Sequence, residues 1–328
     1  MTRRQRVLAA LAGQPVDHVP VSVWLHNFAM ENSAEGLVAE SVRLASRFQW
    51  DFLKPQSRAQ CFAEMWGLRY TPSREQATPY TVTHVPLAGP SDVRQLAPAD
   101  ARDGALGEQL VALRAIRKVV GPDTPIIWTV FSPLMVLPYL LEGGRARTVE
   151  LMRTEPEAVD RALGAMATTL AAYARAAVDD GADGVFYATN MATSKLSTVA
   201  ECRRFQRPHD LRILGAVEGA PFNVLHVCGE DVLFDEFVDY PVAALSWATV
   251  PGNPSLAEGH RRTGRAVLGG LPGKPTMAEL APADVEARGR RAIAEMRGRF
   301  LLLGPDCSID PDTADGVMDA ARAAVLAK

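Results

Sequence analysis

The sequence predicts a (β/α)8 barrel, in which eight parallel strands alternate with helices around one core. Along the 328 residues, eight short segments rich in β-forming residues alternate with segments of helical periodicity. Apolar residues make up 48% of the chain and charged residues 22%, as in a globular protein with a large core. The alternation alone also fits a large open sheet, but the count of eight favours a closed barrel. We expect one barrel domain over residues 1–328.

Each element follows from a local pattern. The predicted strands lie at 19–26, 50–55, 125–131, 182–189, 221–229, 242–247, 266–271 and 299–307. The first predicted helix ends at Gly13. The other predicted helices cover 33–48, 103–120, 156–180, 198–217, 231–238, 281–296 and 312–326. We expect a helical extension over 1–18 and, at about 60–90, an inserted hairpin whose strands, 62–70 and 80–87, flank a polar turn.

Charge and composition exclude several classes of function. A net charge of −3 argues against nucleic acid or an anionic membrane as a partner. The longest apolar stretch, 125–141, contains Pro133 near its middle, which would break a spanning helix. We expect a strand, a loop and a short helix in this stretch, and no membrane segment is predicted. Four scattered cysteines do not form a disulfide framework, and reduced thiols fit a cytoplasmic protein.

The strongest chemical signal is His226 and Cys228 together with the distant Cys307. Two residues apart on a strand, His226 and Cys228 project from the same face. Cys307 ends another apolar strand, and strand ends meet at the mouth of a barrel. Imidazole and thiolates suit zinc, and three protein ligands leave a fourth position open for chemistry. The alternative is that these residues are buried core groups, as we expect for Cys61 and Cys202.

Other candidates lie near predicted strand ends. Glu230 and Asp306 adjoin the predicted ligands and would orient His226 or hold a proton. Lys54 and Arg58 would hold an anionic group of a substrate, unless they are solvated loop charges. A glycine pair at 269–270 fits either an anion site or a tight strand exit. Side chains that either wall a substrate pocket or serve in ordinary barrel packing are Trp24, His26, Lys54, Tyr187, Asn190 and Trp247.

Several segments give the chain a resemblance to a known family. They are residues 4–20, 225–229 (Leu-His-Val-Cys-Gly), 253–256 (Asn-Pro-Ser-Leu), 268–270 (Leu-Gly-Gly) and 304–307 (Gly-Pro-Asp-Cys). Through them the chain resembles the uroporphyrinogen decarboxylase superfamily, specifically its zinc-dependent methyltransferase branch. That branch includes enzymes that move a methyl group between a corrinoid protein and a thiol such as coenzyme M. Its zinc motif matches His226, Cys228 and Cys307, which implies one zinc ion per chain.

The chain also departs from patterns within the superfamily. Uroporphyrinogen decarboxylases carry arginines after the first strand, whereas residues 24–30 contain none. A corrinoid-binding Asp-x-His-x-x-Gly motif is absent from the sequence, so a separate protein would carry any corrinoid. The resemblance therefore implies a thiol substrate and a corrinoid protein as partners, and it leaves a homodimer open. A decarboxylase or lyase on the same scaffold, or a non-catalytic barrel with structural zinc, are the alternatives.

Overall fold

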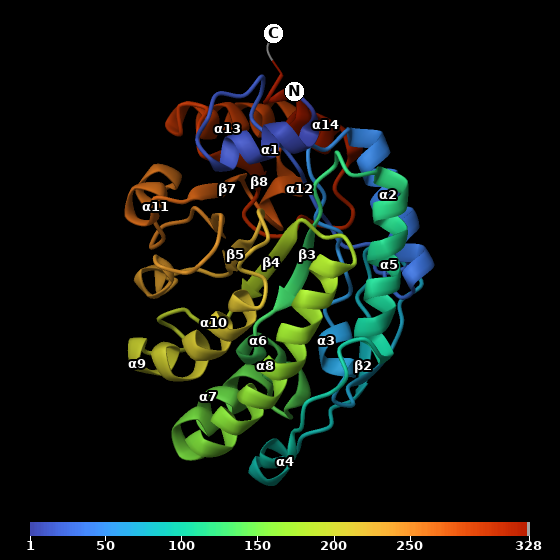
Figure 1. Ribbon diagram of the computed structural model, residues 1–328, viewed down its shortest axis with the longest axis vertical. Coiled ribbons are helices and arrows are strands. Elements are labelled where there is room, and N and C mark those ends of the chain that lie inside the picture. Colours follow the sequence, from blue (N-terminus) through green and yellow to red (C-terminus); the bar gives the residue numbers. More distant parts are fainter. Residues whose placement is uncertain (327–328) are drawn as a thin grey trace.

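The computed structural model describes residues 1–326 and contains a parallel sheet of six strands paired in chain order. Figure 1 shows these strands at the centre of the molecule, with helices around them. All six are almost entirely buried, as expected for strands covered on both sides. Their bounds are β3 (Ile127–Phe131), β4 (Gly184–Thr189), β5 (Val224–Val227), β6 (Ala244–Trp247), β7 (Ala266–Leu271) and β8 (Leu301–Pro305).

Two further segments close the sheet into a barrel. Val21 bridges Leu303 of β8, and Leu53 bridges Ile126 at the start of β3, both in parallel orientation. The N–H of Asp51 donates to the carbonyl of Val21 at 2.9 Å, which joins these two segments to each other. The predicted barrel of eight segments is therefore confirmed.

The first two predicted strands are shorter than expected. Within 19–26 and 50–55 the chain forms only isolated single-residue bridges. Pro20 and Pro55 lack N–H groups, so a continuous ladder cannot pass through them.

The predicted helices are present, most with bounds within a few residues. Ser33 begins α2, where its Oγ accepts a hydrogen bond from the N–H of Gly36, and Pro156 begins α8. The predicted apolar side of α2, which includes Leu37, Leu44 and Phe48, is buried. The helices that match are α1 (Arg3–Leu11), α2 (Ala34–Phe48), α5 (Gly104–Val120), α6 (Pro133–Leu140), α8 (Pro156–Asp179), α10 (Arg207–Gly215), α13 (Pro282–Glu295) and α14 (Asp315–Ala323).

Several boundaries were predicted wrongly. The hairpin pairs β1 (Arg69–Thr71) with β2 (Thr81–His84), and the first part of the predicted strand 62–70 is instead helix α3 (Cys61–Glu64), which buries its apolar side chains on a single turn. The predicted helix 198–217 contains a π-helical turn at Cys202–Gln206, just before Pro208, whose missing N–H interrupts the ladder.

Some short helices differ from the prediction or were not predicted. Only Phe234–Phe237 is helical within 231–238, as a 3-10 turn. Unpredicted helices are α4 (Pro90–Gln95), α7 (Gly144–Thr154), α11 (Leu256–Thr263) and α12 (Thr276–Glu279), and α9 (Val199–Glu201) precedes the π-turn.

A buried ionic network ties the barrel together where the first two segments begin. Arg6 on α1 donates to Asp51 at 2.6 Å and to Asp17 at 2.6 Å. Asp51 also accepts hydrogen bonds from the N–H of Val21 at 3.0 Å and from Arg322 of α14 at 3.0 Å. In Figure 1, α1 and α14 lie together at one end, and α4 and β2 lie at the opposite end.

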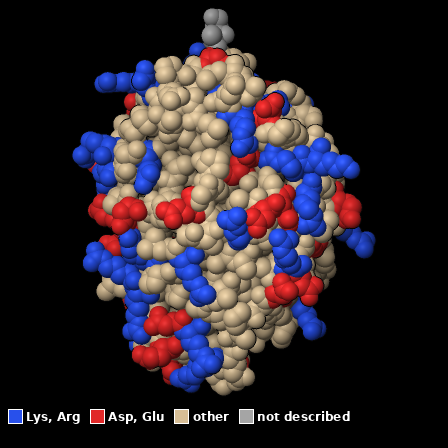
Figure 2. Space-filling model, viewed as in Figure 1, with Lys and Arg blue, Asp and Glu red and all other residues tan. Residues whose placement is uncertain are grey.

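The outer surface carries charges of both signs. On the face shown in Figure 2, lysines and arginines are interspersed with aspartates and glutamates. Among the described residues, no helix has the length and apolar character needed to cross a membrane.

Candidate metal centre

The barrel brings His226, Cys228 and Cys307 together. His226 lies on β5, Cys228 directly follows that strand, and Cys307 lies two residues beyond β8. One nitrogen or sulfur atom from each residue lies within 4.8 Å of the other two. The two Sγ atoms are 3.9 Å apart. Three soft donors from two different strands thus converge at the carboxyl end of the barrel, as the sequence predicted.

His226 is held in a defined orientation. It is buried, its ring stacks on Phe186 of β4 at 5.2 Å between centroids, and its Nδ1 lies 3.1 Å from Oγ of Ser246. Its Nε2 is buried and has no hydrogen-bond partner among the described residues. A buried nitrogen without a hydrogen-bond partner lowers the stability of the fold unless a ligand binds it. A histidine that binds a metal through one ring nitrogen normally forms a hydrogen bond through the other, as Nδ1 does here. The donor set therefore fits a zinc ion.

The two thiols differ in acidity. The hydrogen bond from Cys228 and, opposed by burial, the proximity of His226 hold the pKa of Cys307 well below its usual range. The same thiol–thiol contact, followed by burial, raises the pKa of Cys228. A cation at this position would favour the thiolate form of both residues.

Lys54 lies inside the barrel close to this centre. Its Nζ is 5.1 Å from the ring centroid of Phe186, the residue on which His226 stacks, and 5.8 Å from that of Trp24. Burial lowers the pKa of Lys54 to about 7, although the charges of Cys307 and Glu31 act in the opposite direction.

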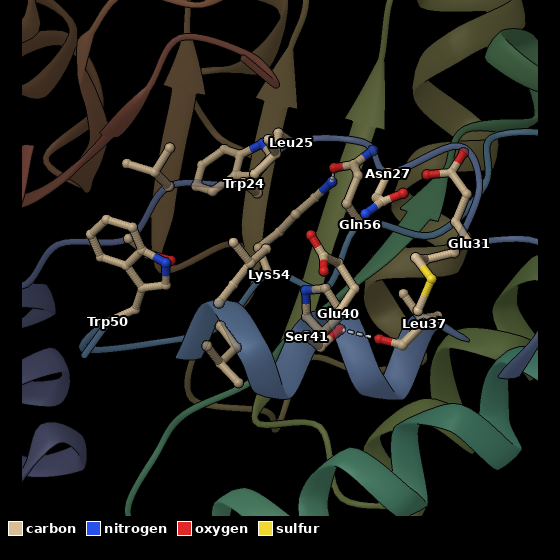
Figure 3. Close-up of a pocket in the computed structure, with 16 residues that line it drawn as sticks. Trp24, Leu25, Asn27, Glu31, Leu37, Glu40, Ser41, Trp50, Lys54 and Gln56 are labelled. Carbon is tan, nitrogen blue, oxygen red and sulfur yellow. Dashed lines mark hydrogen bonds between the residues drawn. The ribbon is translucent and has the colours of Figure 1, made fainter. Parts of the chain in front are cut away.

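A chain of hydrogen bonds fixes this lysine. The Nζ of Lys54 donates to Oε1 of Gln56, and Nε2 of Gln56 donates to Nε2 of His26 at 2.8 Å. The other nitrogen of His26, Nδ1, therefore carries its proton and donates to Glu31 at 2.7 Å. Figure 3 shows Lys54 extending toward Gln56 beside Trp24. Lys54 and His26 thus belong to one hydrogen-bonded chain, and Trp24 lies beside it.

The cavity beside Lys54 is too small for a substrate. Its volume is about 30 Å³, about the share of one water molecule in the liquid. A larger opening lies beside Cys228. Two cavities of about 360 and 240 Å³ share Arg145 and Asn190; the first is also lined by Cys228 and the second by Tyr139. The Oδ1 of Asn190 is buried and has no hydrogen-bond partner within the described part of the chain, which suits a residue that contacts a ligand.

Several predicted site residues lie elsewhere. Tyr187 donates to Asp210 of α10 at 2.5 Å, and Trp247 donates to the carbonyl of Pro254 at 2.8 Å. Both side chains face the helix layer, so we do not assign them to the pocket. Glu230 is exposed and paired with Lys195, and it does not orient His226.

The remaining candidates are also placed by the structure. Asp306 is buried and accepts a hydrogen bond from the N–H of Thr249 at 3.3 Å, while its Oδ1 has no partner among the described residues. Burial raises the pKa of Asp306 to about 7. Arg58 is buried and forms ion pairs with Glu64 and Glu108, so it braces α3 against α5 rather than facing a substrate.

The other two cysteines and the glycine pair have structural surroundings. Cys61 and Cys202 are buried away from the three predicted ligands, and burial raises the pKa of each thiol. Gly270 has φ +98°, and a Cβ there would lie 2.5 Å from that of Ala292. The glycine pair therefore provides a tight strand exit against α13.

Sequence reasoning missed Ser246, Phe186, Gln56 and Glu31. The first two follow from strand register, because His226 pairs with Ser246 on β6 and with Ala188 on β4, two residues beyond Phe186. That register was not accessible before the pairing was known. Gln56 and Glu31 lie in irregular segments, where periodicity gives no direction for a side chain.

Comparison with known proteins places this geometry in a family. The profile of the family described as uroporphyrinogen decarboxylase (URO-D) matches residues 2–326. The chain belongs to this family. A methylcobamide:CoM methyltransferase of Methanosarcina barkeri is 26% identical over 334 residues, which cover 95% of this chain and 94% of that protein. A uroporphyrinogen decarboxylase of Nocardia farcinica is 29% identical over 255 residues, 73% of this chain and 68% of that protein.

A solved structure has the same fold. The methyltransferase from Methanosarcina mazei superposes with a TM-score of 0.85 at 22% identity, covering 99% of this chain and 98% of that one. The expected resemblance to the methyltransferase branch of the uroporphyrinogen decarboxylase superfamily is thereby confirmed.

Proposed function

We propose that this protein is a zinc-dependent methyltransferase that moves a methyl group from a corrinoid, carried by a separate protein, to a substrate thiol. His226, Cys228 and Cys307 would hold one zinc ion. The observation that carries the proposal is the buried Nε2 of His226, which has no partner among the described residues, beside two thiols that lie within 4.8 Å of a ring nitrogen of this histidine. The methylcobamide:CoM methyltransferase among the relatives, which aligns over 95% of this chain, supports the same chemistry.

The ligand set suits activation of a thiol. Two thiolates and a neutral imidazole offset the charge of Zn²⁺ and leave a position for a fourth donor. A zinc ion held by these three residues would favour the thiolate form of a substrate thiol at the fourth position, and so supply a nucleophile at neutral pH.

Protein residues would position the reactants around this centre. The Oγ of Ser246 would accept a hydrogen bond from Nδ1–H of His226 and thereby direct Nε2 toward the two cysteines. Phe186 stacks on the imidazole ring and holds its plane. The opening beside Arg145, Tyr139 and Asn190 would admit a substrate next to Cys228. Lys54, fixed by its hydrogen-bond chain, would place a cation or a neutral amine near Cys307.

A decarboxylase is the second candidate, because decarboxylases are among the relatives. Two observations disfavour it. The segment 24–30 after the first barrel segment offers no arginine to hold the carboxylates of a porphyrinogen. The three soft donors, by contrast, have no task in that reaction but suit the activation of a thiol.

The direct test is methyl transfer from methylcobalamin to a panel of thiols, including coenzyme M, with zinc-loaded protein. We expect thiol-dependent loss of methylcobalamin, and we expect Cys307→Ala to abolish it. Cys202→Ala is the matched control, because it also removes a buried thiol but lies away from the centre. Full turnover by Cys307→Ala with no bound metal would reject the mechanism. Decarboxylation of a porphyrinogen without any methyl transfer would favour the second candidate.

A further inference from the structure

A second cavity lies beside the proposed metal centre without including any of its three ligands. It has a volume of about 450 Å³ and lies between α13 and the chain that leaves β6, β7 and β8. That volume is in the range of small-molecule sites in proteins. Its polar lining includes Thr249, Ser255, Thr276, Arg288, Arg291 and Asp306.

Two arginines on α13 supply the positive charge of this cavity. Arg288 and Arg291 are three residues apart, so their side chains project from one face of the helix. Neither forms a hydrogen bond or ion pair with any residue in the described part of the chain, although Arg288 is half-buried. On the same helix, Arg290 pairs with Glu286 at 2.8 Å and does not line the cavity. Arg288 and Arg291 therefore keep their donors available on the cavity side.

Two carboxylates, those of Glu295 and Asp306, also lie in the cavity wall. Glu295 accepts a hydrogen bond from the N–H of Ala257, in the first turn of α11, at 2.8 Å. Asp306 accepts one from the N–H of Thr249 at 3.3 Å and is buried. Neither carboxylate forms an ion pair with Arg288 or Arg291 among the described residues, although Arg288 is close enough to Asp306 for their charges to interact. The hydrogen-bond donors of the two guanidinium groups are therefore not occupied by these carboxylates.

The walls of the cavity are well defined. Gly270, at the end of β7, lets the strand approach α13 so closely that any Cβ would collide with Ala292. On the opposite wall, the side-chain amide of Asn253 donates to the carbonyls of Gly229 and Ala248, both at 2.9 Å, and so fixes the loop after β6. The hydroxyl of Ser255 caps α11 by accepting from the N–H of Glu258, and its own proton stays free to donate.

We propose that this cavity is a second binding site, which takes a small acidic molecule through an oxyanion group held by Arg288 and Arg291. Guanidinium groups bind phosphate and carboxylate through paired hydrogen bonds, and the hydroxyls of Ser255 and Thr276 add donors on the other walls. Asp306 lines the cavity and directly precedes Cys307, so an occupant would lie next to the proposed metal centre without replacing any of its ligands.

The test is isothermal titration calorimetry of the full chain with two probes, inorganic phosphate and malonate, at constant ionic strength. We expect saturable binding of one molecule per chain. The double variant Arg288→Gln/Arg291→Gln should weaken it at least tenfold. Arg290→Gln, on the same helix but outside the cavity, removes one positive charge instead of two and should change it less than twofold. The probe that binds more tightly identifies the occupant as a phosphate or a carboxylate compound.

Two results would overturn the proposal. One is the absence of saturable binding for both probes; the other is an equal loss of affinity in Arg290→Gln and in the double variant, which would indicate diffuse attraction to a basic surface. His226 does not line the cavity, so the same titration of the His226→Ala variant serves as a control. We expect this variant to bind both probes with unchanged affinity. Failure of the zinc chemistry and failure of this second site can thus be told apart.

Discussion

The two ends of the barrel differ in the hydrogen-bond pairing of the buried polar groups compared below. Where the strands begin, Asp51 is almost fully buried but receives hydrogen bonds from Arg6, Val21 and Arg322, so its charge is fully compensated. Where the strands end, buried polar atoms of His226, Asn190 and Asp306 have no partner among the described residues. Unpartnered buried groups cost stability unless a ligand binds them. We conclude that the strand starts hold the fold together and that the strand ends are arranged for binding.

Asp183 repeats the pattern of the strand starts. It lies just before β4, where it pairs with Arg4 and, at 2.5 Å, with Arg117, and also accepts the N–H of Ile126 at 2.8 Å. Two buried aspartates thus anchor the starts of separate barrel segments to the first helix and to an outer helix.

The largest expected effect is on stability at the strand starts. Arg6→Ala would leave Asp51 and Asp17 without their shared partner, and loss of one member of a buried pair costs about 3–5 kcal/mol. Urea unfolding measures this loss. Arg47→Ala, which breaks an exposed pair with Asp319, is the control and should cost far less, because solvent screens an exposed ion pair. Similar losses in both variants would remove the special role of the buried network.

The next effect is on metal affinity at the strand ends. Ser246→Ala removes the acceptor that fixes Nδ1 of His226, and such partners typically contribute about 10–100-fold to metal affinity. Competition with a zinc chelator measures the change. Ser22→Ala is the matched control, because Ser22 is also a buried barrel serine but its hydroxyl has no partner in residues 1–326. Unchanged zinc affinity in Ser246→Ala would show that the serine does not orient His226.

The strand starts also predict how stability depends on pH. Burial raises the pKa of Asp51, but His18, Arg322 and the N–H of Val21 lower it more, so the folded pKa lies below the unfolded value of about 3.9. The stabilisation from Asp51 is therefore fully present above about pH 4 and is lost as the pH falls through the folded pKa, at no more than about 1.4 kcal/mol per pH unit.

Urea unfolding at pH 7, 4 and 3 tests this dependence on Asp51. Asp51→Asn should be less stable than the parent protein at pH 7, and the difference should shrink as the pH falls. A difference that stays constant across this range would show that the charge of Asp51 does not stabilise the fold.

The smallest effect on stability is expected at Lys54. Lys54→Met removes a buried cation whose partner in the hydrogen-bond chain is an amide, so the loss of that bond and the relief of burial should nearly cancel, within about 1 kcal/mol. Thiol-dependent methyl transfer should nevertheless fall, because Lys54 lies near Cys307. Arg47→Ala should not affect activity. A large loss of stability in Lys54→Met would place this lysine with the structural charges.

Much of the fold could be predicted from sequence because it rests on periodicity. The apolar runs at β3 to β8 and the helical patterns of α2, α5 and α8 each carry a local signal. The 62–64 segment shows the limit of this reasoning. Its apolar residues fit a strand or a buried helical turn equally well, and tertiary packing selects the turn.

The candidate site could be predicted only in part for a similar reason. The spacing of His226 and Cys228, and the place of Cys307 at a strand end, are written in the sequence. The direction of a side chain at a strand end is not, because one residue of register reverses it. Tyr187 and Trp247 therefore face the helices instead of the pocket, whereas Phe186 faces His226.

The metal content of protein purified without a histidine tag, measured beside the His226→Ala variant, tests the proposed zinc centre most directly. We predict about one zinc ion per chain in the parent protein and its loss in the variant, with the fold retained in both. Protein that binds no zinc even after incubation with the ion, or a variant that retains it in full, would contradict the assignment of His226, Cys228 and Cys307 as a metal centre.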